Sequence, residues 1–198
     1  MSGILRNKTA VQCVEEGIRY GVGNLPEHGR GTPILCMKAI RLVLTIPGPA
    51  DAVWSAWTTS EGLATFFAPQ ALVELWPGGK FELYFRLDAP AGSRGSEGCR
   101  IQTFVPGTLL AFEWNAPPRF PTVRLRKTWV VVQFQALGLV ATRVTLTHLG
   151  WGDGPEWDAA HQYFRRSWGV VLARLEHRFE SGPFQWSPPG IGSGESRT

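Results

Sequence analysis

Histidines are the first residues to consider as catalytic or metal-binding groups, and the chain has 4 of them. His161 and His177 fall in one predicted helix and lie about 24 Å apart by helical rise, so they cannot share a metal ion. His148 alternates with Val144 and Leu146, which places it on the strand face that carries core residues. Two environments are open for it: the edge of the core, with the imidazole hydrogen-bonded to the backbone, or a cavity in which it orients a polar group of a ligand.

Two carboxylates, Glu97 and Glu113, are further candidates for an inward position. A carboxylate or His148 inside an apolar pocket could act as a general base with a shifted pKa. Solvated positions on the outer surface are the alternative for both glutamates. Because the sequence shows no nucleophile paired with a base, we predict no catalytic residue.

Cysteine and glycine patterns predict neither a metal site nor a phosphate site. The 3 cysteines are widely spaced and form no CxxC, which is typical of reduced thiols in a cytoplasmic protein. The glycine-rich segments 78–79 and 150–154 lack the Lys-Ser/Thr pair of a phosphate-binding loop and are predicted to be turns. We therefore expect no metal and no cofactor.

Aromatic residues dominate the chain, with 9 Trp and 11 Phe among 198 residues. The rings on the apolar strand faces either fill an ordinary core or line a cavity between a curved sheet and a helix. A cavity of this kind suits a small apolar or amphipathic ligand, and we favour it over a solid core. The predicted cavity residues are Trp57, Phe66, Phe67, Phe81, Phe85, Phe112, Trp114, His148, Phe164 and Trp168.

The elements that position these residues follow from hydrophobic periodicity. Alternation from Lys38 to Ile46 predicts a first strand, and two short helices follow it, over 51–57 and from Ser60, which can cap the second. The next segments have strand composition and are separated by turn residues, so we expect antiparallel pairing. They are 72–76, 80–87, 97–105, 109–114, 127–136 and 141–148.

A long C-terminal helix is the clearest element of the chain. Asp153 and Glu156 resemble a capping box, and Pro155 suits a first helical turn. Gly182 followed by Pro183 predicts its end. Its apolar face is formed by Phe164, Trp168, Val171, Leu172, Leu175 and Phe179.

The chain length predicts one domain, residues 37–182, with an extension on each side. The N-terminal extension, 1–36, has only a weak helical pattern over 9–19 that glycines interrupt, so it is predicted to be poorly ordered or weakly helical. Because Met37 directly precedes the first strand, we hypothesise that it is the natural start of the protein. Intact mass measurement of the native protein tests this hypothesis.

The tail, residues 183–198, is rich in Gly, Ser and Pro and is predicted to be flexible, with Phe184 and Trp186 as an anchor. The net charge of +4 arises from scattered basic residues, which does not indicate nucleic-acid binding. No apolar run is long enough to span a membrane and the N-terminus has no secretory signal, so we predict a cytoplasmic protein without a membrane partner.

One strand departs from the usual polar outer face. Trp129 and Val131 share the face of Lys127, Gln133 and Gln135, which is predicted to point outward. An outward Trp-Val pair indicates that something covers it. The N-terminal extension, the tail and a second subunit are candidates, and we favour a homodimer.

Several of these stretches together resemble a known superfamily. The sequence is similar to the SRPBCC, or START-like, superfamily, and within it to bacterial proteins similar to the C-terminal domain of the heat-shock-protein-90 ATPase activator. The resemblance covers residues 38–182. The stretches that carry it are 53–58, 61–63, 66–69, the turn at 77–79, 106–114 and 147–151.

The resemblance implies an α+β helix-grip fold, with a curved antiparallel sheet of about six to seven strands around a long C-terminal helix and two short helices after the first strand. Because the chain has an excess of aromatic residues and no catalytic grouping, we expect a ligand-binding protein, with stress response as one setting. The alternatives are a cyclase-type or hydrolase-type enzyme that uses the same cavity, and a module that binds a chaperone through Trp129 and Val131. The fold alone does not choose among them.

Overall fold

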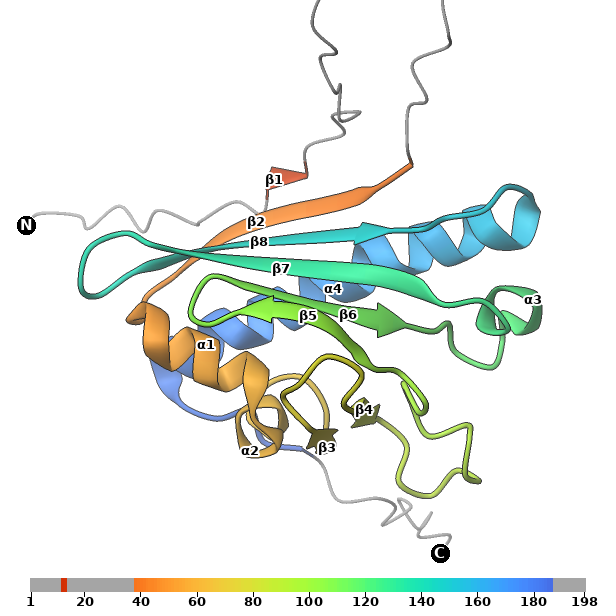
Figure 1. Cartoon of the computed structure of the whole chain (residues 1–198), viewed down its shortest axis with the longest axis horizontal. Helices are drawn as coiled ribbons and strands as arrows, with labels where there is room; N and C mark the ends of the chain where they lie inside the picture. Colours follow the sequence, from red (N-terminus) through yellow and green to blue (C-terminus); the bar gives the residue numbers. More distant parts are fainter. Residues whose placement is uncertain (1–11, 14–37, 187–198) are drawn as a thin grey trace, which may run out of the picture.

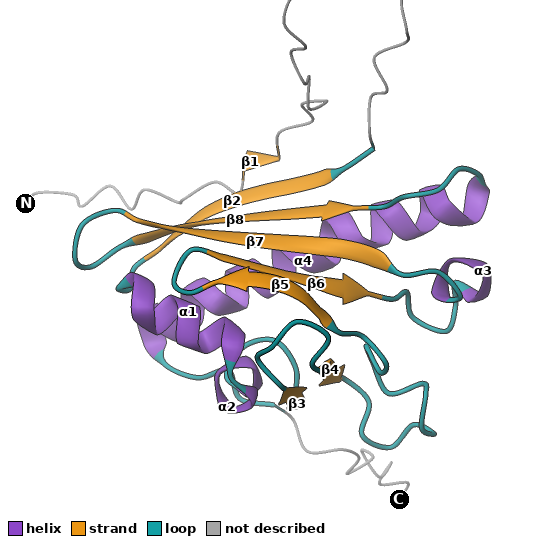
Figure 2. Ribbon diagram, viewed as in Figure 1, coloured by secondary structure: helices purple, strands orange, loops and turns teal. Residues whose placement is uncertain are grey.

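The computed structural model describes residues 12–13 and 38–186 of the chain, and it has the α+β helix-grip architecture that the sequence predicts. One large antiparallel sheet curves over the long helix α4 (Pro155–Ser181), which runs behind the strands in Figure 1. Helices α1 (Ala50–Thr58) and α2 (Ser60–Ala64) lie with a smaller sheet below the large one in Figure 2. None of the described helices is both long and apolar enough to cross a bilayer.

The large sheet has the strand order β1-β2-β8-β7-β6-β5, and all neighbours are antiparallel. Strands β2 and β8 are far apart in the sequence but pair from Ile40 opposite His148 to Ile46 opposite Thr142. This pairing places β8, the last strand in the sequence, next to β2, which precedes the two short helices. The strands are β1 (Gln12–Cys13), β2 (Ile40–Ile46), β5 (Ile101–Val105), β6 (Leu109–Trp114), β7 (Thr128–Ala136) and β8 (Thr142–Leu149).

The smaller sheet consists of β3 (Gln70–Val73) and β4 (Phe81–Tyr84). Backbone hydrogen bonds connect it to β5, because the N–H of Gly78 donates to the carbonyl oxygen of Ile101 at 2.7 Å and the N–H of Ile101 donates to that of Gly79 at 2.8 Å. Lys80 and Arg100 form a bridge next to these bonds. Strand β4 ends at Tyr84 because the backbone N–H groups of Phe85 and Arg86 both donate to the carbonyl oxygen of Arg94, at 2.9 and 3.0 Å. The strand alternation predicted over 80–87 therefore stops before Phe85.

The cap of α2 lies one residue earlier than predicted. Thr59 Oγ1 accepts a hydrogen bond from the N–H of Gly62 at 3.0 Å and so satisfies an N-terminal donor of the helix. Ser60 is the first helical residue, and its Oγ accepts from the N–H of Val73 at 3.0 Å. The serine thus joins α2 to β3 instead of capping the helix.

Helix α4 begins at Pro155 and ends at Ser181, and it is followed by Gly182, whose φ of +103° favours glycine. The predicted capping box is wrong, because the residue that precedes the helix is Gly154, which has no side chain to accept a hydrogen bond. Glu156 Oε1 instead accepts from the N–H of Val123 at 2.9 Å. This contact fastens α3 (Pro121–Arg124), a short helix that the sequence did not predict, to the start of α4.

The core is one continuous cluster between the sheet, α1, α2 and α4. Strand β7 shows how alternation sorts its residues, since Val130 and Val132 are buried while Trp129 remains 48% exposed on the outer face. Val131 is half-buried on that same face. The prediction that Trp129 and Val131 point outward is confirmed.

Two residues of the N-terminal extension belong to the sheet. Gln12 and Cys13 form β1 and pair with Val43 and Leu42 of β2, so the backbone of these two residues is extended within a segment predicted to be poorly ordered or weakly helical. Pairing with β1 satisfies backbone N–H and C=O groups of β2 at the edge of the sheet. A short helix interrupted by glycines could not form these hydrogen bonds. Met37, the rest of the extension and residues 187–198 lie outside the described residues.

The start of the tail is anchored as the sequence predicts. The N–H of Phe184 donates to the carbonyl oxygen of Thr65 at 2.7 Å, and the indole N–H of Trp186 donates to that of Ala64 at 2.6 Å. The two rings contact each other with centroids 4.7 Å apart. Residues 183–186 therefore return the chain to the end of α2.

Candidate functional site

A pocket with a volume of about 360 Å³ lies between α4 and two loops. One wall is the loop that follows β4, residues 85–96. A second wall is the end of β6 with the proline-containing loop 114–118, and the third is the face of α4 over 163–174. This volume is within the range of small-molecule sites in proteins.

An aromatic cluster forms the inner wall of the pocket. Phe67 contacts Trp114 and Trp168 with ring centroids 5.6 Å from each, and the two indoles lie 5.3 Å apart. Phe85 meets Trp114 edge to face at 6.4 Å and is 41% exposed at the pocket mouth. Phe67, Trp114 and Trp168 are only 2%, 4% and 1% exposed, so Phe85 presents the largest aromatic surface to a ligand.

Five of the ten residues that the sequence predicts for the cavity line this pocket, namely Phe67, Phe85, Trp114, Phe164 and Trp168. The other five, Trp57, Phe66, Phe81, Phe112 and His148, are buried behind it in the core. Phe81 and Phe112 stack there with centroids 4.1 Å apart, and Trp57 packs on Phe66 at 5.3 Å. The structure therefore contains both a solid aromatic core and a pocket at the edge of that core.

His148 lies in the core behind the aromatic wall of the pocket and connects the two tryptophans of that wall through a series of hydrogen bonds. The indole N–H of Trp168 donates to His148 Nδ1 at 2.9 Å, and because an indole nitrogen only donates, the imidazole proton is on Nε2. Nε2 donates to Thr128 Oγ1 at 2.8 Å, and that hydroxyl donates to the carbonyl oxygen of Trp114 at 3.0 Å. These hydrogen bonds thus connect α4, β8, β7 and β6, and they include both Trp114 and Trp168 of the pocket lining.

The imidazole of His148 is neutral. Burial lowers its pKa well below the usual value of 6.5, and the charge of His161 adds a smaller lowering. Both ring nitrogens are engaged, and the side chain is not part of the pocket lining. These contacts match the environment in which His148 is a hydrogen-bonded core residue, although its partners are side chains and not the backbone.

Neither glutamate points into the pocket, so the inward alternative for them is wrong. Glu113 lies on the outer face of β6, between the buried Phe112 and Trp114, and accepts a hydrogen bond from Gln102 Nε2 at 3.0 Å. Glu97 lies in the loop that precedes β5. In the described part of the chain, the pocket lining contains no His, Cys, Asp or Glu, which removes Glu113 and His148 as bases within it.

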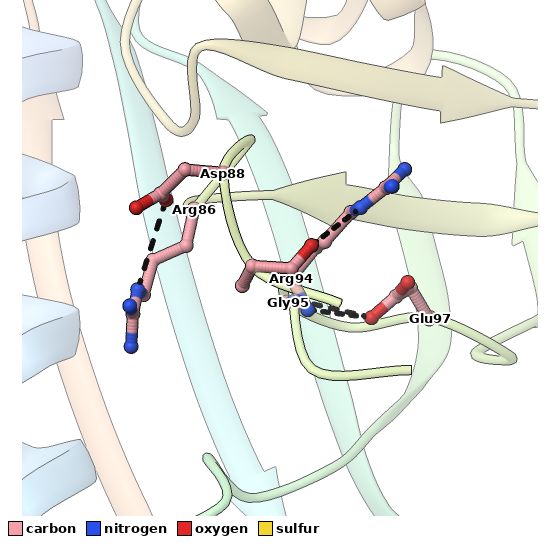
Figure 3. A network of polar contacts seen from close by, with 6 residues as sticks. Arg86, Asp88, Arg94, Gly95 and Glu97 are labelled. Atoms are coloured by element: carbon pink, nitrogen blue, oxygen red, sulfur yellow. Dashed lines mark hydrogen bonds and ion pairs between the residues drawn. The ribbon is translucent and has the colours of Figure 1, made fainter. Parts of the chain in front are cut away.

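Glu97 has a structural task in the loop that forms one pocket wall. Its carboxylate accepts from the backbone N–H groups of Gly92 and Arg94, both at 2.7 Å. Figure 3 shows its contact with Gly95, whose N–H lies 3.4 Å away. Three donors on one carboxylate hold the loop 92–95 in a single shape.

Arg124 joins the two loops of the pocket. Its guanidinium donates to the carbonyl oxygen of Ala116 on one loop and to those of Gly92 and Gly95 on the other. Five donors in a planar fork allow one arginine to make these three contacts. Arg124 thus fixes the distance between the walls without lining the pocket.

The polar residues of the pocket were missed by sequence reasoning. On α4 they recur as Tyr163, Ser167 and Arg174, a helical spacing beside the apolar face of the helix. This periodic signal was present in the sequence. The residues that loops contribute, such as Arg86 and Asn115, carry no comparable periodicity.

Metal and redox chemistry receive no support from the described residues. Among them, no group of three His, Cys, Asp or Glu side chains could hold a metal ion. Cys99 is a free, buried thiol, and burial raises its pKa to about 11 although Lys127 Nζ lies 3.3 Å from its sulfur. A thiol with this pKa is protonated near neutral pH and is a poor nucleophile.

Comparison with known proteins places these observations in a family. The profile of the Activator of Hsp90 ATPase homolog 1-like proteins matches residues 47–180, which is most of the described domain. No curated protein sequence matches the chain.

Solved structures share the fold at low sequence identity. Protein MLL2253 from Mesorhizobium loti has a TM-score of 0.59 at 15% identity, covering 74% of this chain and 100% of that one. The Aha1 dimer from Colwellia psychrerythraea has 0.55 at 18%, covering 74% and 98%. PFC0360w, an HSP90 activator from Plasmodium falciparum, has 0.54 at 18%, covering 71% and 94%.

Proposed function

The chain belongs to the family of Activator of Hsp90 ATPase homolog 1-like proteins, and on that premise we propose that it binds a small apolar or amphipathic molecule in the pocket beside α4. The observation that carries the proposal is a pocket of about 360 Å³ whose inner wall consists of Phe67, Trp114 and Trp168. A stress-response setting and a cytoplasmic location are part of this proposal.

A second feature supports a ligand with a polar atom. Trp114 is only 4% exposed, and its indole N–H has no hydrogen-bond partner among the described residues. A buried donor without a partner is costly, and an oxygen atom of a ligand that reaches this N–H through the pocket would satisfy it. Trp57 has an unpartnered N–H too, but it lies in the core, away from the pocket lining.

Binding is tested by screening the full chain against a library of lipids and aromatic compounds, with melting temperature and tryptophan fluorescence as readouts. Trp114 and Trp168 line the pocket, so an occupant should change the fluorescence. At a concentration 100-fold above Kd, a ligand should add about 2.7 kcal/mol to the stability. A library without effect on either readout would contradict the proposal.

Two variants of α4 locate the binding. Ser167 lines the pocket, and Ser167→Phe should fill it and weaken binding at least about tenfold. Ala173 is exposed on the same helix outside the lining, so Ala173→Phe should leave binding unchanged. Equal affinities of the two variants would show that the ligand binds elsewhere.

We also propose that the chain forms a homodimer through the outer face of β7. Trp129 is 48% exposed in the middle of the large sheet, next to the half-buried Val131, and an exposed tryptophan at such a position favours a covering partner. The related solved protein from Colwellia psychrerythraea is described as an Aha1 dimer.

The mass in solution, measured by light scattering, tests the dimer. Trp129→Ser should convert it to a monomer, whereas Trp76→Ser, at an equally exposed tryptophan in the turn after β3, should leave the mass unchanged. A wild-type monomer would refute the dimer. In that case, loss of chaperone binding by Trp129→Ser alone would assign the face to a chaperone partner.

A further inference from the structure

The charged residues of the pocket are all basic. Arg86, Arg94 and Arg174 line it, and within the described chain no carboxylate does. A pocket that combines aromatic walls with a net positive charge on its lining residues selects for an amphipathic anion. We infer that the ligand of the proposed pocket has a negatively charged head group, a carboxylate or a phosphate, attached to an apolar body. This inference rests on the proposed function.

Of the three arginines, Arg174 is the one best placed to bind an anionic head group. It lies half-buried on α4, with its guanidinium carbon 4.3 Å from the ring centre of Phe184 and 5.1 Å from that of Trp186. Among the described residues it forms no ion pair with a carboxylate. The two rings of the anchored tail, which are not part of the pocket lining, thus hold the charge of this lining residue without neutralising it.

Partial burial strengthens the attraction of the Arg174 guanidinium for an anion. Loss of solvent lowers the pKa of Arg174 below its usual value, and an arginine nevertheless remains charged at neutral pH. A desolvated guanidinium attracts a carboxylate or phosphate more strongly than an exposed one does, and its planar fork can donate two parallel hydrogen bonds.

Arg86 supplies a second positive charge from the opposite wall, in the loop after β4. Its only ion-pair partner among the described residues is Asp88, at 4.0 Å, and both side chains are largely exposed. Such a pair is weak and can yield to a ligand. Figure 3 shows the Arg86 guanidinium extending beside Asp88, in a different direction from that of Arg94.

Arg94 serves chiefly to shape the loop. Its Nε donates to the carbonyl oxygen of Ala89 at 3.0 Å, and its backbone N–H donates to Glu97. The arrangement therefore places the charge for an anionic head on Arg86 and Arg174 and the apolar surface on the ring cluster deeper in the pocket.

The test compares acids with neutral analogues of the same shape on the full chain, by titration calorimetry. A decyl series uses decanoate, decyl phosphate and decanamide, and a naphthyl series uses naphthylacetate, naphthyl phosphate and naphthylacetamide. A hydrogen bond to a charged group predicts that at least one acid in a series binds about tenfold tighter than the amide. The tighter of the two acids distinguishes a carboxylate head from a phosphate head.

Two arginines of α4 provide a matched pair of variants. Arg174→Gln should abolish the preference for acid over amide, while Arg166→Gln, at an exposed position outside the pocket lining, should retain it. The preference of the wild type should also decrease as salt is raised, because Arg86 is exposed to screening ions. The wild-type comparison needs no variant and remains decisive if Arg174→Gln does not fold.

The outcomes separate this inference from the proposed function. Amides that bind as tightly as the acids overturn the anionic head group and leave the apolar pocket as a binding site. Absence of binding by every member of both series overturns both. A preference for acids that survives in Arg174→Gln also overturns the assignment of the head group to Arg174.

Discussion

Replacement of Trp168 by phenylalanine should destabilise the protein through the hydrogen bond that it removes. The indole N–H of Trp168 is the donor to His148 Nδ1, at 2.9 Å, and both side chains are buried. In Trp168→Phe the imidazole acceptor stays buried without a partner, because its other nitrogen is already bound to Thr128. An unsatisfied buried acceptor costs about 1–3 kcal/mol.

Trp57→Phe is the matched control for this change. Trp57 is as buried as Trp168 and is packed by aromatic rings in the same way, but its indole N–H has no partner among the described residues. Both replacements remove the same atoms of a buried indole, so each leaves a cavity in the core. Because Trp57→Phe also removes a buried donor without a partner, the difference between the two variants contains the hydrogen bond to His148 together with that relief.

Urea unfolding followed by circular dichroism measures both stabilities. We expect Trp168→Phe to be less stable than Trp57→Phe by about 1–3 kcal/mol, which corresponds to a melting temperature lower by about 2–12 °C for a domain of this size. In a His148→Leu background the difference should shrink, since the acceptor is gone. Equal losses for Trp168→Phe and Trp57→Phe in the wild-type background would refute the role assigned to His148.

Three further predictions concern pH and two glycines. Stability should fall as the pH drops below about 6.5, by up to about 1.4 kcal/mol per pH unit, because the unfolded chain takes up a proton that the folded His148, with its lowered pKa, does not. Urea midpoints that stay flat from about pH 8 to about pH 5 would contradict a neutral His148. Gly169→Ala should raise the stability by about 1 kcal/mol in calorimetry, because the added Cβ in α4 meets no atom within 4 Å. Gly95→Ala should lower the melting temperature and ligand binding together, since its Cβ would lie 1.8 Å from the carbonyl oxygen of Leu83; a variant of unchanged stability would disprove the close approach.

The predictions that succeeded from the sequence depend on local periodicity. Alternation along β2 and β7 identified their inner and outer faces, including the exposed Trp129, because side chains of a strand point to opposite sides in turn. Helical spacing identified the buried face of α4, and Gly182 marked its end. The family followed from the same stretches, since the profile match spans residues 47–180.

Local details were missed where a side chain found a partner distant in the sequence. Glu156 has the spacing of a capping box, yet its carboxylate accepts from Val123, 33 residues away. Glu113 was open to an inward or an outward position until its place in β6 was known. The position of each depends on the neighbouring element and not on the residues beside it in the chain.

The sequence by itself determined the order of the elements from β2 to α4, apart from α3, together with the faces of the long strands and α4 and the aromatic composition of the interior. Only the tertiary structure divided those aromatic residues, placing Trp57 and Phe81 in a solid core and Trp114 and Trp168 at a pocket. The physical reason is that the pocket lies where two loops meet α4, and their approach is fixed by long-range hydrogen bonds such as those of Arg124. Periodicity specifies which face of an element is apolar, but not whether the space in front of it is filled.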